Sequence, residues 1–167
     1  MSVQKQTTKF DKKSQLGRLL FWVTWPGIWL TLKSSPPRTR VVLHYKGQVL
    51  VLRNWLGTGE WGLPGGGLHR GEEPVAGGVR EVAEEVGLTL KPSDLHELGR
   101  YHLRSSGIKI RYVAFWVECR TKPAIVVDGK EVVAAQWVDL DKLEEYPLTS
   151  SARHILLAFS NRSNLVE

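Results

Sequence analysis

The chain has 167 residues, of which 42% are hydrophobic and 24% charged. This composition is typical of one globular domain and excludes a wholly disordered chain. The single cysteine, Cys119, excludes an internal disulfide and fits a reducing compartment. The net charge of +6 is concentrated in residues 1–40, which carry eight Lys or Arg residues and one Asp. The basic character therefore belongs to an N-terminal extension, which is either a solvated tail or a segment that contacts anionic lipid or nucleic acid.

The N-terminal extension divides into two segments. Residues 1–18 are polar and basic, which predicts a disordered tail. Residues 19–38 hold an uncharged, Trp-rich run, LLFWVTWPGIWLTL (19–32), and a Pro linker. As a helix, the run reaches about 21 Å at about 1.5 Å per residue, too short for a hydrocarbon core about 30 Å thick. We expect a cytoplasmic protein in which 19–32 contacts the inner face of the membrane peripherally. The alternative is that this run contacts the main domain or a second subunit of a homodimer.

The main domain is expected over residues 39–160, with a C-terminal tail at 161–167. Runs rich in β-branched residues predict strands, and Lys46-Gly47 predicts a hairpin between the first two. Proline first and glycine last delimit a helix from Pro74 to Val86. The expected strands are 39–45, 48–54, 96–103, 108–120 and 134–140, and the expected helices are 74–86, 139–146 and 151–160. This mixed order predicts an α+β sandwich.

Three glutamates share one face of the helix expected at 74–86. At about 100° per residue, Glu84 and Glu85 lie about 60° and about 40° to either side of Glu81. Such carboxylates repel one another, and a hard divalent cation offsets that repulsion. A solvated acidic face is the alternative interpretation. A glycine triplet, Gly65 to Gly67, precedes this helix, and its backbone groups are suited to meet phosphate or metal.

The segment from Gly66 to Leu88, GGLHRGEEPVAGGVREVAEEVGL, resembles the Nudix box. The matching positions are Gly66, Glu72, Arg80, Glu81, Val82, Glu84, Glu85, Gly87 and Leu88. The resemblance implies an α/β/α sandwich with a mixed β-sheet. It also implies hydrolysis, by water attack at phosphorus, of a diphosphate linkage in a nucleoside diphosphate derivative or nucleoside triphosphate. Mg²⁺ is the implied cofactor, and Mn²⁺ is expected to substitute for it.

The same resemblance implies roles for individual residues. Glu84 and Glu85 are implied metal ligands, and Glu81 is a ligand or a group that helps to deprotonate the water. Arg80 would orient these acids by charge-assisted hydrogen bonds. Glu72 would support the metal or pair with Arg80, and the carbonyl near Gly65 would be a further ligand.

The substrate is expected to meet the glycine loop at Gly66 and Gly67, with Arg53 and His69 as further phosphate contacts. For both of these side chains, a structural or surface role is the alternative. The stretch GKEVVAAQW (129–137) resembles the MutT segment that contributes a remote glutamate. Glu131 is therefore a candidate catalytic base or additional ligand, against the alternative of an exposed loop residue.

Other function classes have weaker support. The chain lacks a serine nucleophile elbow, a metal-spaced histidine pair and a dinucleotide fingerprint, and no specific DNA binding is expected. Two alternatives stay open. One is a catalytically weak nucleotide-binding module, and the other is a membrane-associated enzyme that acts on RNA 5′ ends or a lipid-linked diphosphate.

Overall fold

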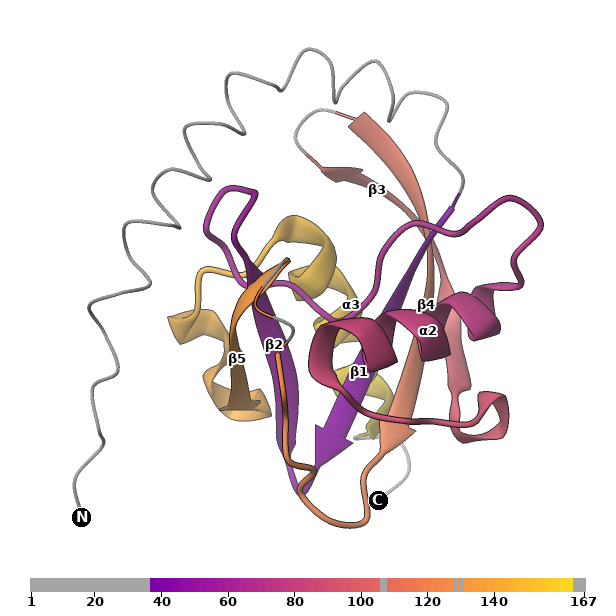
Figure 1. Cartoon of the computed structure of the whole chain (residues 1–167). Coiled ribbons are helices and arrows are strands. Elements are labelled where there is room, and N and C mark those ends of the chain that lie inside the picture. Colours follow the sequence, from indigo (N-terminus) through magenta and orange to yellow (C-terminus); the bar gives the residue numbers. More distant parts are fainter. Residues whose placement is uncertain (1–36, 106–107, 128, 130, 164–167) are drawn as a thin grey trace.

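The computed structural model describes residues 37–105, 108–127, 129 and 131–163 (Figure 1). Its elements are, in chain order, β1 (Arg38–Tyr45), β2 (Gln48–Asn54), α2 (Pro74–Val86), the 3₁₀ helix η1 (Pro92–Asp94), β3 (His96–Ser105), β4 (Ile108–Glu118), β5 (Val132–Asp139), the 3₁₀ helix η2 (Leu140–Glu145) and α3 (Ser150–Ser163). The predictions for segments 1–18 and 19–32 fall outside the described residues. In the described part of the chain, no helix is long and apolar enough to cross a membrane.

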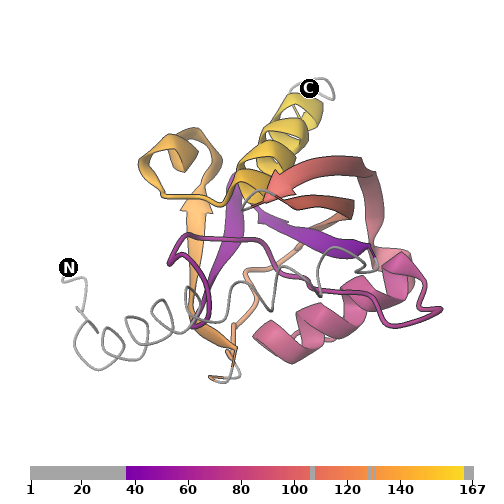
Figure 2. The same ribbon diagram turned by 90° about the horizontal axis from the view of Figure 1, so that it is seen from above.

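Five strands form one mixed sheet in the order β3-β4-β1-β2-β5. β1 runs parallel to β4, with Val41 beside Phe115, whereas the other neighbouring strands are antiparallel. Helices α2 and α3 lie on opposite faces of this sheet, as the two views in Figures 1 and 2 show. The predicted α+β sandwich with a mixed sheet is therefore confirmed.

The β1–β2 hairpin turns at Lys46 and Gly47, as expected. Their φ angles are 45° and 77°, so both residues have left-handed backbone conformations. Two consecutive left-handed residues are typical of the type I′ turn, whose twist matches that of the flanking strands. Only Gly47 adopts such a conformation without a steric cost.

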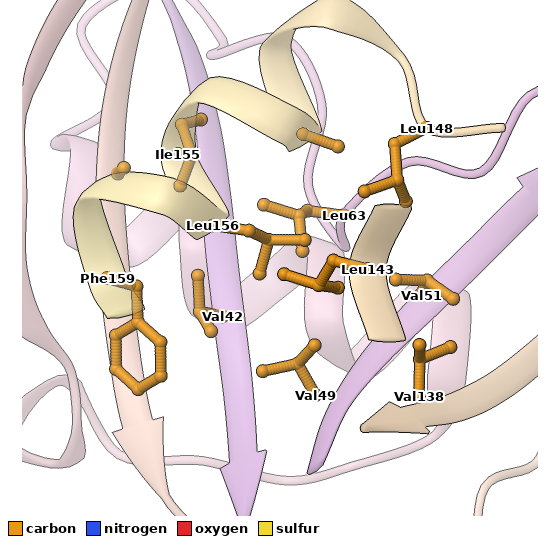
Figure 3. Packing of buried hydrophobic residues seen from close by; sticks show 12 residues of the cluster. Val42, Val49, Val51, Leu63, Val138, Leu143, Leu148, Ile155, Leu156 and Phe159 are labelled. Atoms are coloured by element: carbon orange, nitrogen blue, oxygen red, sulfur yellow. The ribbon is translucent and has the colours of Figure 1, made fainter. Parts of the chain in front are cut away.

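Two hydrophobic clusters hold the layers together. Val42 of β1 faces α3 and contacts the cluster that contains Ile155, Leu156 and Phe159 (Figure 3). Val41 faces the other way and belongs to the cluster beneath α2. Because β1 is central and covered on both faces, its apolar residues form a continuous run instead of alternating with polar ones.

The observed boundaries differ from the predicted ones around β5 and at the end of α3. Helix α3 extends to Ser163, so it includes the first three residues of the tail predicted at 161–167. Strand β5 begins at Val132, two residues before the expected start, because Val132 already pairs with Asn54 of β2. The expected helix at 139–146 is a six-residue 3₁₀ helix with a single buried side chain, that of Leu143. Such a tight helix is usual for a short connection that buries so little apolar surface.

Candidate active site

The glycine loop follows the edge of β1 through backbone hydrogen bonds. The amide of Thr39 donates to the carbonyl of Gly66 at 2.9 Å, and that of Val41 donates to the carbonyl of Pro64 at 2.9 Å. Gly65 has a φ of 126°, and a Cβ atom there would lie 2.9 Å from the Thr39 carbonyl carbon and nearer still to its oxygen. A side chain at Gly65 would therefore push the loop away from β1.

Helix α2 presents two of its glutamates to this loop. Val82 and Val86 are fully buried against the sheet, and they fix the rotation of the helix. Glu85 is 6% exposed, and its Oε2 accepts a 2.8 Å hydrogen bond from the Gly65 amide. Burial raises the pKa of Glu85 to about 7, and the Gly65 bond and the charge of Arg40 oppose that shift only in part. Folding thus places a carboxylate where its charge is costly.

Arg80 organises the remaining carboxylates of the motif. Its Nε lies 2.8 Å from Glu72, and its NH1 lies 3.0 Å from Glu81 and 3.1 Å from Glu84. Its NH2 also donates to the carbonyl of Gly67 at 3.1 Å. The hydrogen bonds from Arg80 lower the pKa of Glu72 to about 2, and the same contacts raise the pKa of Arg80. The guanidinium therefore joins the loop to the helix.

A cavity of about 490 Å³ opens beside the loop and α2. The side chains of Glu81 and Glu85 line it together with the glycine triplet, and Glu131 joins them from the residue just before β5. The amide of Trp55 donates to the Glu131 carbonyl at 2.9 Å, which anchors Glu131 to the end of β2. The structure therefore brings together acids that are 50 residues apart in the chain.

Five residues of the expected site do not line this cavity. Two of them, Arg80 and Glu72, form the ion pair described above. The side chain of Glu84 is 60% exposed and turned toward Arg80. Arg53 stacks its guanidinium over Trp61 at 5.2 Å. The side chain of His69 is 72% exposed, and its Nδ1 lies 4.0 Å from Glu72. The angles expected from the sequence placed Glu84 on the same helical face as Glu81 and Glu85. The same angular position also brings Glu84 within reach of Arg80, one turn earlier on the helix.

Other cavity residues belong to no recognised sequence motif. Arg38 and Arg40 line the cavity from β1, Tyr112 lines it from β4, and 149–151 line it at the start of α3. The spacing of the two arginines within a strand places them on one face. However, what they face depends on β4 and α3, which lie more than 60 residues further along the chain.

The donors around the loop fit a hard divalent cation. Among the described residues, no three His, Cys, Asp or Glu side chains form a ready-made metal-binding group, and Arg80 holds Glu81 and Glu84. The carboxylates of Glu81 and Glu131 nevertheless lie close enough to Glu85 to raise its pKa further. A cation would offset this crowding of negative charge, and carboxylate and carbonyl oxygens are the ligands that Mg²⁺ prefers.

Comparisons with known proteins agree with this geometry. The model of the NUDIX domain family matches residues 35–159. The chain therefore belongs to the Nudix family, and the resemblance of its glycine loop and acidic helix to the Nudix box is confirmed.

Three similar proteins illustrate the range of this family. A MutT-like protein of Streptomyces ambofaciens is 32% identical over 105 residues, which cover 63% of this chain and 64% of that protein. Nudix hydrolase 8 of Arabidopsis thaliana is 31% identical over 94 residues, 54% of this chain and 24% of that protein. The match thus spans less than two thirds of either relative. The crystallised NUDIX domain of Shewanella oneidensis NrtR, complexed with ADP ribose, shares the fold, with a TM-score of 0.66 and 19% identity over 78% of this chain and 89% of that one.

Proposed function

We propose that this protein hydrolyses a diphosphate linkage in a nucleoside diphosphate derivative or a nucleoside triphosphate, with Mg²⁺ or Mn²⁺ as its cofactor. One observation carries the proposal. The buried carboxylate of Glu85 lies at the wall of the cavity, close to Glu81 and Glu131, with its pKa raised to about 7. A carboxylate with a raised pKa that lines a cavity beside other carboxylates is typical of catalytic sites. The names of the MutT-like and Nudix hydrolase relatives support the same reaction.

The carboxylates of the site have two proposed roles, which are to bind a cation and to accept a proton from water. Glu84, Glu85 and the Gly65 carbonyl are the proposed metal ligands, with Glu81 as a further one. When bound, the cation would neutralise charge on the diphosphate oxygens and lower the pKa of the attacking water. Glu84 must turn from Arg80 toward the cavity to take part, and its exposed position leaves it free to do so.

Hydrolysis forms one bond to phosphorus and breaks another. The water oxygen bonds to one phosphorus, the bond from that phosphorus to the bridging oxygen breaks, and a water proton passes to a carboxylate. Glu131 and Glu81 both line the cavity and are the two candidates to accept it. Arg80 fixes Glu81 through a 3.0 Å hydrogen bond, whereas Glu131 reaches the site from a different element.

Metal-dependent turnover is the direct test of the proposal. Hydrolysis of nucleoside di- and triphosphates, nucleotide sugars and capped RNA would be followed by phosphate detection, with Mg²⁺ or with excess chelator. We expect Glu84→Gln and Glu85→Gln each to lower kcat/KM by at least about a hundredfold. Glu145→Gln, on the exposed surface of η2, is the matched control and should retain wild-type turnover. Turnover that is insensitive to the chelator would reject the proposal.

A further inference from the structure

Two arginines stand side by side in the cavity. Arg38 and Arg40 lie on the same face of β1 as Val42, the face covered by α3. Burial lowers the pKa of Arg40 most, and the nearby charge of Arg38 lowers it further. The charges of Glu85 and Glu81 offset this effect only in part. Like charges repel each other, so the arrangement gains stability when a further anion lies between or beside the two arginines.

The two arginines differ in how much of their hydrogen-bonding capacity is used. NH1 of Arg40 donates to the carbonyls of Gly65 and, at 2.9 Å, Thr39, and its guanidinium lies 5.5 Å from the centre of the Tyr112 ring. Arg40 is thus held in place next to the catalytic loop. The buried Nε of Arg38, by contrast, has no hydrogen-bond partner among the described residues. An unsatisfied buried donor is costly. The Arg38 side chain as a whole is only half-buried, so a small movement of the guanidinium toward the cavity would let an anionic ligand satisfy this donor.

The first turn of α3 faces the same cavity. Thr149 caps the helix, since its Oγ1 accepts a 3.3 Å hydrogen bond from the Ala152 amide. Within the described chain, the amides of Ser150 and Ser151 have no such partner, and no acidic residue lies in this turn. The N-terminal end of a 14-residue helix carries partial positive charge and free N–H groups, which favour an anion.

This part of the cavity offers charge instead of an aromatic surface. Tyr112 is the only aromatic side chain among the described residues that line the cavity, and Arg40 already lies over its ring. The proposed metal ligands come from α2 and the glycine loop, and Glu131 comes from the residue before β5, so these groups approach from other elements. Arg38 lies two residues before Arg40, about 6.6 Å along β1, and its backbone pairs with Gly67, whereas Arg40 bonds to Gly65. Arg38 is therefore offset along the loop from the linkage expected at Gly65.

We propose that Arg38, Arg40 and the first turn of α3 bind a further phosphate group of the substrate, separate from the scissile diphosphate. This inference rests on the proposed function and narrows its substrate class. The preferred substrate is a nucleotide diphosphate compound that carries an additional phosphate, as on a ribose hydroxyl. Arg38 supplies most of the selectivity for the substrate with the additional phosphate, because Arg40 also donates hydrogen bonds to the carbonyls of Thr39 and Gly65.

Matched substrates that differ by one phosphate test this proposal. NADPH and NADH differ by a 2′-phosphate, and coenzyme A and dephospho-coenzyme A differ by a 3′-phosphate. We expect the full-length protein to favour the phosphorylated member of at least one pair by about tenfold to a hundredfold in kcat/KM. Arg38→Gln should abolish that preference by slowing only the phosphorylated member. Lys109→Gln, which removes an exposed cation of β4 outside the cavity, should preserve the preference.

The contribution of α3 is tested by a pair of variants at one position. Ser150→Pro removes an amide at the first helical position, where proline is tolerated, whereas Ser150→Ala keeps the amide and removes only the hydroxyl. The proposal requires Ser150→Pro to weaken the preference more than Ser150→Ala does. Circular dichroism and thermal unfolding of each variant would establish that the fold is retained.

Binding without turnover separates this inference from the proposed function. Calorimetry would compare adenosine 3′,5′-bisphosphate and adenosine 2′,5′-bisphosphate with AMP in the wild type and in Arg38→Gln. Tighter binding of a bisphosphate that depends on Arg38 supports the subsite, even if no diphosphate is hydrolysed. Two results would overturn the subsite and leave the proposed function standing. One is hydrolysis with the same kcat/KM for both substrates of every pair. The other is an Arg38→Gln variant whose kcat/KM falls equally for both substrates of a pair.

Discussion

Replacing Gly66 by alanine tests how closely the glycine loop fits the catalytic helix. The added Cβ would lie 2.7 Å from both Cδ and Oε2 of Glu81, and closer still to Oε1, where ordinary contact begins near 3.4 Å. The carboxylate must therefore withdraw by about 1 Å, and Arg80, hydrogen-bonded to it at 3.0 Å, must move with it. Because the displaced atoms are the far end of the Glu81 side chain, the loss of stability should lie at the low end of the range of about 1–3 kcal/mol typical of overpacking. A displacement of about 1 Å in a catalytic group costs about a hundredfold in rate.

The assay is steady-state hydrolysis at saturating Mg²⁺, together with thermal unfolding of the same preparations. Gly78→Ala is the matched control, because its Cβ would lie 2.9 Å from Cδ2 of Leu95 and would crowd α2 without touching Glu81. We expect both variants to lose stability but only Gly66→Ala to lose about a hundredfold in kcat. A kcat within twofold of wild type in Gly66→Ala, or an equal loss in the control, would refute this reasoning.

Folding raises the pKa of Glu85 from 4.5 to about 7, so the metal-free protein should lose about 3 kcal/mol of stability as pH rises through that interval. Glu85→Gln should remove this pH dependence. The free energy of unfolding would be measured by denaturant titration in chelator at pH 4.5 and pH 8. An equal change between the two pH values in the wild type and in Glu85→Gln would contradict the prediction. Glu131→Gln should lower kcat by about a hundredfold with an unchanged melting temperature, and wild-type rates would make Glu131 a bystander. The full chain should float with anionic liposomes, while a chain that begins at Pro37 should remain in the soluble fraction. Equal recovery of both chains in the soluble fraction would contradict membrane contact through 19–32.

Local patterns were sufficient to predict the elements that carry the motif. Helix α2 has the predicted bounds, Pro74 and Val86, because its proline start, its glycine end and its valine stripe act within a few turns of chain. The hairpin at Lys46-Gly47 was predictable for the same reason, since turn geometry depends on two neighbouring residues. The Nudix box is likewise a single continuous segment, so its recognition needed no knowledge of the fold.

Contacts between elements far apart in the chain determine which side chains of the site are buried and which groups surround them. The pKa of Glu85 is raised to about 7 because tertiary packing buries it against the Gly65 loop, while Glu84, at the adjacent helical position, stays exposed. Arg38 and Arg40 enter the cavity because β1 lies parallel to β4 and α3 covers that face of the sheet. Spacing along the chain indicates which side chains share a face, but burial and charge proximity arise only when distant elements meet. The pKa of a carboxylate and the partner of an arginine depend on those distant elements.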